Sequence, residues 1–170
     1  MPNSESDFTL QDGVLRFNDE AKSLRATVEG RIINSATKNR EWKEQVACTV
    51  KAQRGDQWCS KHLYAVTLQF RFRQLRTPRD VDNYVKPVLD GLAAGLFLEE
   101  DKFLPDGHID IPTFAVHYGV DDSNFRTLLI RRLPDAANTL EQEEVHLFVS
   151  RAGAPPDTEA TDQSGKAHPR

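Results

Sequence analysis

The segment 63–73 carries the clearest strand pattern in the chain. Every second residue is large and apolar, and the residues between them are polar or cationic. The apolar positions are Val66, Leu68, Phe70 and Phe72, and the polar positions are Thr67, Gln69, Arg71 and Arg73. Because successive side chains of a strand point to opposite faces, one face of this strand is expected in a core and the other is expected to carry cations.

A helix is predicted to follow over 82–94, where apolar residues recur at helical spacing. Its buried side would be formed by Val85, Val88, Leu89, Leu92 and Leu96. Gly95 is expected to end the helix, because glycine is common just past a helix C-terminus. Pro87 lies in the middle and removes a backbone donor, so we expect a kink there or a regular helix confined to the far end.

The remaining patterned segments add strands and one more helix. Strands are predicted at 24–32, 113–120, 126–133 and 145–149, with a short partner strand at 14–17, and a helix is predicted at 35–51. Lys51 and Arg54 lie near the last turn of that helix, where cations are favourable. The order of segments predicts an α+β fold, with a mixed β-sheet of about five strands and two main helices.

The chain of 170 residues, 38% of them hydrophobic, is expected to form one domain over 1–150. Residues 151–170 contain no large apolar residue and are predicted to form a disordered acidic and polar tail.

The N-terminus is polar and no apolar run approaches the roughly 18 residues of a membrane span, so we expect a cytoplasmic protein with no membrane partner. Cys48 and Cys59 form no CxxC motif and the histidines do not cluster, which argues for reduced cysteines and against a zinc site.

Charge is divided unevenly along the chain. Residues 21–79 contain 13 lysines and arginines against four acids, whereas residues 80–122 contain ten acids against two lysines. The formal net charge of −4 hides this division. A basic surface beside a carboxylate pocket is typical of proteins that hold nucleic-acid phosphates and recruit divalent cations. From composition alone, an accidental segregation on an ordinary mixed surface is an equally open interpretation.

The change from the basic segment to the acidic segment falls at a motif of closely spaced ionisable side chains. Asp80 and Asp82 are two residues apart, Lys86 follows, and an acidic triplet returns at 99–101. Carboxylates in this pattern indicate a magnesium-dependent phosphodiester site. Asp80 and Asp82 can converge on one ion only if Asp80 precedes the helix and Asp82 lies in its first turn. An extended return of about 20 Å after the helix would just bring Asp101 back to them.

The spacing of this motif extends over 79–101. It comprises Arg79, Asp80, Asp82, Asn83, Lys86, Asp90 and Leu92, followed by an acidic pair that closes on Asp101. The pattern resembles the signature of the RusA family of Holliday junction resolvases, endonucleases that cut four-way DNA junctions. The resemblance implies a RusA-like fold, binding of Mg²⁺ or Mn²⁺ by Asp80, Asp82 and Asp101, and a contribution of Lys86 to catalysis.

Other residues are expected to support this site. Asp90 is expected to orient Lys86 rather than to bind metal, while Asn83 and Glu100 would lie around the metal ligands. Without the resemblance, a local salt bridge of Lys86 to Asp82 or Asp90 is an equal alternative to a catalytic role. The candidates for phosphate contact are Lys38, Arg40, Lys43, Arg71, Arg73, Arg76 and Arg79.

The carboxylate pattern predicts a magnesium-dependent phosphodiesterase site. The resemblance implies an endodeoxyribonuclease that cleaves branched DNA, as a Holliday junction resolvase in DNA recombination and repair. The near two-fold symmetry of a four-way junction, which is resolved by paired cuts, predicts a symmetric homodimer. Two alternatives stay open. One is a noncatalytic DNA-binding or regulatory protein with the same fold, and the other is a related nuclease that prefers flaps or other DNA structures.

Overall fold

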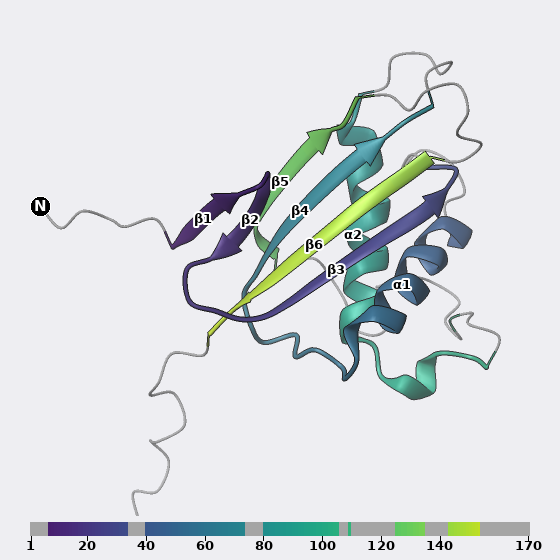
Figure 1. Cartoon of the computed structure of the whole chain (residues 1–170). Coiled ribbons are helices and arrows are strands. Elements are labelled where there is room, and N and C mark those ends of the chain that lie inside the picture. The colour runs from purple at the N-terminus through teal and green to yellow at the C-terminus, as the bar shows by residue number, and fades with distance from the viewer. Residues whose placement is uncertain are drawn as a thin grey trace, which may run out of the picture.

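The computed structural model describes residues 7–33, 40–73, 80–105, 109, 125–134 and 143–153 (Figure 1). In chain order its elements are β1 (Phe8–Gln11), β2 (Val14–Phe17), β3 (Glu20–Gly30), α1 (Arg40–Arg54), β4 (Tyr64–Arg71), α2 (Asp82–Phe97), the short 3-10 helix η1 (Glu100–Lys102), β5 (Phe125–Arg132) and β6 (Glu143–Ala152). This is the α+β class that the sequence predicts.

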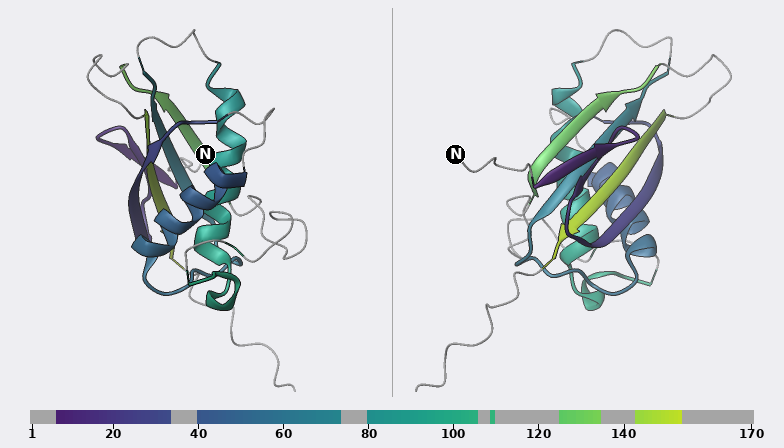
Figure 2. Two further views of the ribbon diagram at one scale, coloured as in Figure 1. Left: turned by 90° about the vertical axis from the view of Figure 1, so that its right-hand side faces the viewer. Right: turned by 60° about the vertical axis from the view of Figure 1, so that its left-hand side comes forward.

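Four strands form one mixed sheet in the order β3, β6, β4, β5. β6 pairs antiparallel with both β3 and β4, whereas β4 pairs parallel with β5. Both α1 and α2 cover one face of this sheet, and β1 and β2 form a separate hairpin on the other face (Figure 2). The prediction of a mixed sheet with two main helices is confirmed.

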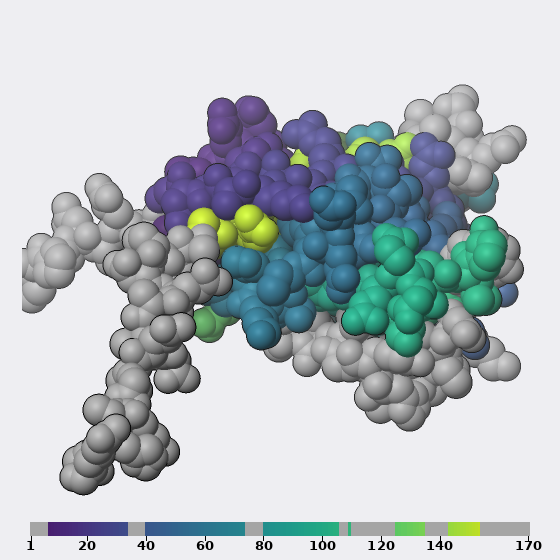
Figure 3. Space-filling view, turned by 90° about the horizontal axis from the view of Figure 1, so that it is seen from below, coloured from purple at the N-terminus to yellow at the C-terminus, as the bar shows by residue number. Residues whose placement is uncertain are grey.

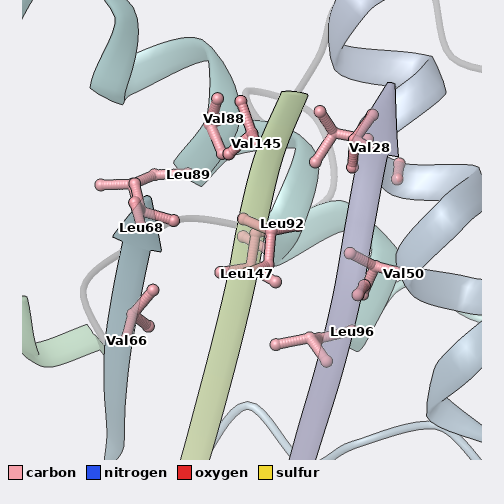
Figure 4. Close-up of a cluster of buried hydrophobic side chains, with 14 of the residues drawn as sticks. Val28, Val50, Val66, Leu68, Val88, Leu89, Leu92, Leu96, Val145 and Leu147 are labelled. Atoms are coloured by element: carbon pink, nitrogen blue, oxygen red, sulfur yellow. The ribbon is translucent and has the colours of Figure 1, made fainter. Parts of the chain in front are cut away.

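The core lies between the sheet and the two helices (Figure 4). The apolar side of β4 is completely buried, with Leu68 and Phe70 both at 0% exposure. α2 contributes Val88, Leu92 and Leu96 to the same core, as the helical spacing predicted. Burial of these side chains orients α2 and leaves its other residues toward α1 and solvent.

α1 and α2 pack closely because two glycines of α2 leave room for the backbone of α1. A side-chain carbon added at Gly91 would lie 2.7 Å from the carbonyl oxygen of Lys43. One added at Gly95 would lie 2.7 Å from the carbonyl oxygen of Ala47. Gly95 therefore does not end the helix as predicted, and its role is to permit the close contact of the two helices.

Several element boundaries differ from the expected ones. α2 continues to Phe97 rather than ending at Ala94, and its helical conformation extends through Pro87, so the regular part is not confined to the far end. α1 ends at Arg54, beyond the expected residue 51. β6 reaches Ala152, two residues past the expected domain boundary at residue 150. The strand expected at 113–120 and residues 154–170 of the tail expected at 151–170 lie outside the described residues.

The strand predicted at 14–17 is present but pairs with β1 instead of joining the main sheet. The backbone N–H of Leu15 donates to Thr67 Oγ1 at 2.9 Å, and that of Phe17 donates to Ser150 Oγ at 3.2 Å. Thr67 is 0% exposed, so the hairpin covers part of the strand face that was expected to carry cations. Within the part of the chain described here, no helix has the length and apolar character needed to cross a membrane.

Replacing Gly91 or Gly95 with alanine should destabilise the protein. Helix propensity alone would stabilise each variant by about 1 kcal/mol. The added carbon, however, meets backbone that cannot move without separating α1 from α2, and overpacking of this kind costs about 1–3 kcal/mol or more. Thermal unfolding should therefore show a lower melting temperature for both variants. A raised melting temperature in either variant would show that the helices are not in close contact at that glycine.

Candidate active site

The N-terminal end of α2 presents two carboxylates to solvent. Asp80 precedes the helix, Asp82 is its first residue, and both are exposed. The backbone carbonyl of Asp80 accepts a hydrogen bond from the N–H of Asn83 at 3.3 Å, which turns the chain into the helix. This is the arrangement that the two-residue spacing requires for convergence. The positive end of the helix dipole also favours negative charge at this point.

Aromatic contacts fix this end of α2 against the sheet. The ring of Tyr84, in the first turn, lies 5.3 Å from the ring of Phe72 in an edge-to-face arrangement. Phe72 in turn stacks on Phe70 at 6.0 Å. Because Phe72 directly follows β4, the two aspartates are held at the carboxyl end of that strand.

Asp90 joins two lysines on adjacent helices. Its Oδ1 lies 2.6 Å from Lys86 Nζ, and its Oδ2 lies 2.8 Å from Lys43 Nζ. Asp90 is only 7% exposed, so this carboxylate is buried between the helices. The contact fits the expected role of Asp90 in orienting Lys86. It also places Lys43, a candidate for phosphate contact, against Asp90.

Asp101 lies at the opposite end of α2. The helix has 16 residues and is therefore about 24 Å long. The segment 98–101 that follows spans at most about 14 Å, so it cannot return to the first turn. The expected convergence of Asp101 with Asp80 and Asp82 within one chain is therefore wrong, because α2 is longer than predicted.

Glu100 fastens η1 to the end of α1. Its Oε1 lies 2.9 Å from Arg54 Nη2, and its Oε2 lies 2.9 Å from Lys51 Nζ. Hydrogen bonding, first from Lys51 and then from Arg54, lowers the pKa of Glu100 below its ordinary value. In Figure 3 the green segment around η1 lies on the surface beside the blue segment that follows α1. Glu100 thus holds Asp101 at this end, far from Asp80 and Asp82.

Arg54 organises the same end from inside. Its side chain is fully buried, and Nη1 donates to the carbonyl oxygens of Leu96 at 2.7 Å and Leu98 at 3.3 Å. The backbone N–H of Trp58 also donates to the Leu96 carbonyl, at 3.0 Å. These contacts satisfy carbonyls that the end of a helix leaves without intrahelical partners. Sequence alone indicated Arg54 only as a cation near a helix end.

Those predicted phosphate contacts that the structure describes do not form one surface. Arg40 pairs with Glu44 at 3.1 Å on α1, whereas Arg71 pairs with Glu144 at 3.5 Å on the sheet face opposite the helices. Arg73 is exposed just beyond β4. The candidates that lie outside the described residues are Lys38, Arg76 and Arg79.

The first turn of α2 suits a magnesium ion, although it supplies only two carboxylates. Among the described residues, no three His, Cys, Asp or Glu side chains lie close enough to hold a metal ion together. Mg²⁺ is commonly bound by one or two carboxylates, with waters and substrate phosphate as the remaining ligands. Asp80 and Asp82 fit that requirement, whereas the expected set of three carboxylates is not formed within one chain.

A family model for the endodeoxyribonuclease RusA matches residues 2–115. The match covers more than half of the 170 residues and includes both ends of α2. The chain belongs to the RusA endodeoxyribonuclease family. A separate search among curated proteins gave no match. Membership of the RusA family confirms the resemblance and implies endonuclease activity on Holliday junctions.

Glu100→Gln should lower the melting temperature at neutral pH, because Lys51 and Arg54 lose their charged partner. Since the pKa of Glu100 is lowered in the folded state, its contribution is present above the ordinary value of 4.5 and is lost as the pH falls through the folded-state pKa. The melting temperatures of wild type and variant should therefore differ by a constant amount around neutral pH and become equal in acid.

Glu99→Gln is the matched control, because it removes the same charge from the exposed residue next in sequence. It should leave the melting temperature close to that of wild type. An equal loss in both variants would show a general charge effect rather than the pairing of Glu100.

Proposed function

We propose that this chain is a magnesium-dependent Holliday junction resolvase that hydrolyses phosphodiesters of branched DNA during recombination and repair in the cytoplasm. The observation that carries the proposal is the pair of exposed carboxylates at the start of α2, Asp80 and Asp82, in a member of the RusA family. Mn²⁺ has similar ligand preferences and would serve as an alternative ion.

The residues around the first turn of α2 would divide the work. Asp80 and Asp82 would hold the ion, which when bound would stabilise charge on the phosphate and activate water. Lys86 lies one helical turn after Asp82, on the same side of α2, and its side chain is 57% exposed. Its ammonium group would add fixed positive charge beside a phosphate oxygen. Asn83, also exposed, would hydrogen-bond to water or phosphate at the site.

Asp101 would join this site from a second protomer. A symmetric dimer repeats each end of α2, so Asp101 of one protomer can face Asp80 and Asp82 of the other without any change in η1. The contacts of Glu100 with Lys51 and Arg54 support this arrangement, because they hold Asp101 away from its own chain's aspartates. A four-way junction also presents two equivalent strands to a two-fold symmetric enzyme.

Asp80→Asn and Asp82→Asn should each suppress cleavage by orders of magnitude while junction affinity holds or rises. Asparagine retains the volume but removes the charge that attracts the cation and repels phosphate. Cleavage of a labelled four-way junction with magnesium and gel-shift binding without it measure the two effects separately. Asp56→Asn, at an exposed residue after α1, is the control and should cleave normally. Wild-type cleavage by either site variant would contradict the metal assignment.

Mixing Asp80→Asn protein with Asp101→Asn protein should restore cleavage that neither has alone. In a mixed dimer, one of the two shared sites receives intact Asp80, Asp82 and Asp101, whereas the other loses two carboxylates. Exchange of protomers followed by a junction cleavage assay should therefore show nicking of one strand. No recovery, with mixed dimers verified by tagged co-purification, would show that each site draws on a single chain.

A noncatalytic junction-binding protein is the second candidate, favoured by the separation of Asp101 from Asp80 and Asp82 within one chain. The same assay decides between the candidates when wild type is incubated with four-way, flap and linear DNA in magnesium. Cleavage of the four-way junction supports the resolvase, preference for the flap supports a related nuclease, and binding without cleavage supports the noncatalytic protein.

A further inference from the structure

We propose that Lys43 is the permanent counter-ion of Asp90, which allows Lys86 to leave Asp90 for a DNA phosphate. The proposal rests on the proposed nuclease function and specifies how Lys86 becomes available to substrate. Lys43 thereby acts as a positioning residue through Asp90, and does not itself contact DNA.

The two lysines use different oxygens of the same carboxylate. Lys43 Nζ lies 2.8 Å from Oδ2, and Lys86 Nζ lies 2.6 Å from Oδ1. Departure of Lys86 therefore leaves the contact between Lys43 and Asp90 intact. A buried carboxylate that loses its only cation is strongly destabilised. With Lys43 in place, the movement of Lys86 avoids most of that cost.

The two lysines differ in exposure, as the proposal requires if Lys43 stays at Asp90 and Lys86 leaves it. The side chain of Lys43 is 17% exposed, whereas that of Lys86 is 57% exposed. Lys43 also belongs to the stretch of α1 whose backbone lies against Gly91, next to Asp90. Close packing of the helices thus keeps Lys43 at Asp90, while Lys86 stands at the outer side with solvent around it.

Lys86 also lies midway along α2 between Asp82 and Asp90. Asp90 is four residues after it on α2 and Asp82 is four residues before it, so each lies one helical turn away on the same side. A change of side-chain rotamer moves Nζ from Asp90 toward the metal-binding end of the helix. The backbone of α2 does not have to move.

Binding measurements without divalent metal test whether Lys86 leaves Asp90 for a DNA phosphate, independently of cleavage. The salt dependence of four-way junction affinity is compared for wild type, Lys43→Gln, Lys86→Ala and the double variant. Without Lys43, Lys86 must stay on Asp90, so each single variant should reduce the salt slope by about one phosphate contact. The double variant should reduce it no further, because Lys43 acts only through Lys86. Lys43→Arg, which keeps a cation at Asp90, should retain the wild-type slope.

Two results would overturn the proposal. A loss of about two contacts in the double variant would show that Lys43 itself binds phosphate. An unchanged slope in Lys43→Gln would show that Lys86 leaves Asp90 without help. Lys43→Gln is expected to fold, because Asp90 retains Lys86, and circular dichroism at the assay temperature checks this.

Cleavage with magnesium provides a second readout. Lys43→Gln should cleave the junction at least about tenfold more slowly than wild type, since a buried charge pair holds Lys86. Adding Asp90→Asn to Lys43→Gln should restore most of the rate, because a neutral amide no longer retains Lys86. A double variant as slow as Lys43→Gln would show a merely structural role and overturn the proposal. Absence of cleavage by wild type would refute the nuclease function, while the salt slopes would still decide the exchange.

Discussion

The close contact between α1 and α2 determines where the charged groups of this protein lie. Gly91 and Gly95 let the two helices approach until backbone meets backbone. Lys43 is thereby brought to Asp90 in the middle of the contact, and Arg54 is brought to the last carbonyls of α2 at its end. An ordinary side chain at either glycine would separate the helices and remove both sets of interactions.

Local patterns were sufficient to predict much of the fold. The alternation in 63–73 and the helical spacing after Asp82 each identify the apolar side of an element. That side is the one buried in the core. The placement of Asp80 outside the helix and Asp82 inside it also followed from their spacing, because two residues of one regular helix cannot converge. The RusA resemblance rested on the motif at 79–101, whereas the family model matches residues 2–115.

What sequence could not predict depends on partners distant in the chain. Gly95 has the sequence signature of a helix end, and only the presence of α1 explains why it lies inside a helix. The wrong prediction for Asp101 followed from the wrongly predicted end of α2. A shorter helix would have left more extended chain to return to Asp80 and Asp82. The buried role of Arg54 likewise depends on carbonyls more than 40 residues away. No local pattern records such contacts.

A helix that is fixed at both ends also limits how this chain can change in length. Aromatic rings hold the first turn of α2 at the sheet, Arg54 holds its last carbonyls, and the two glycines must face α1 in between. Inserting or deleting one residue within α2 would rotate one end against the other by about 100°. A change of length within α2 would therefore disturb the contacts at one of its ends, and the length of α2 sets the separation between the two acidic ends.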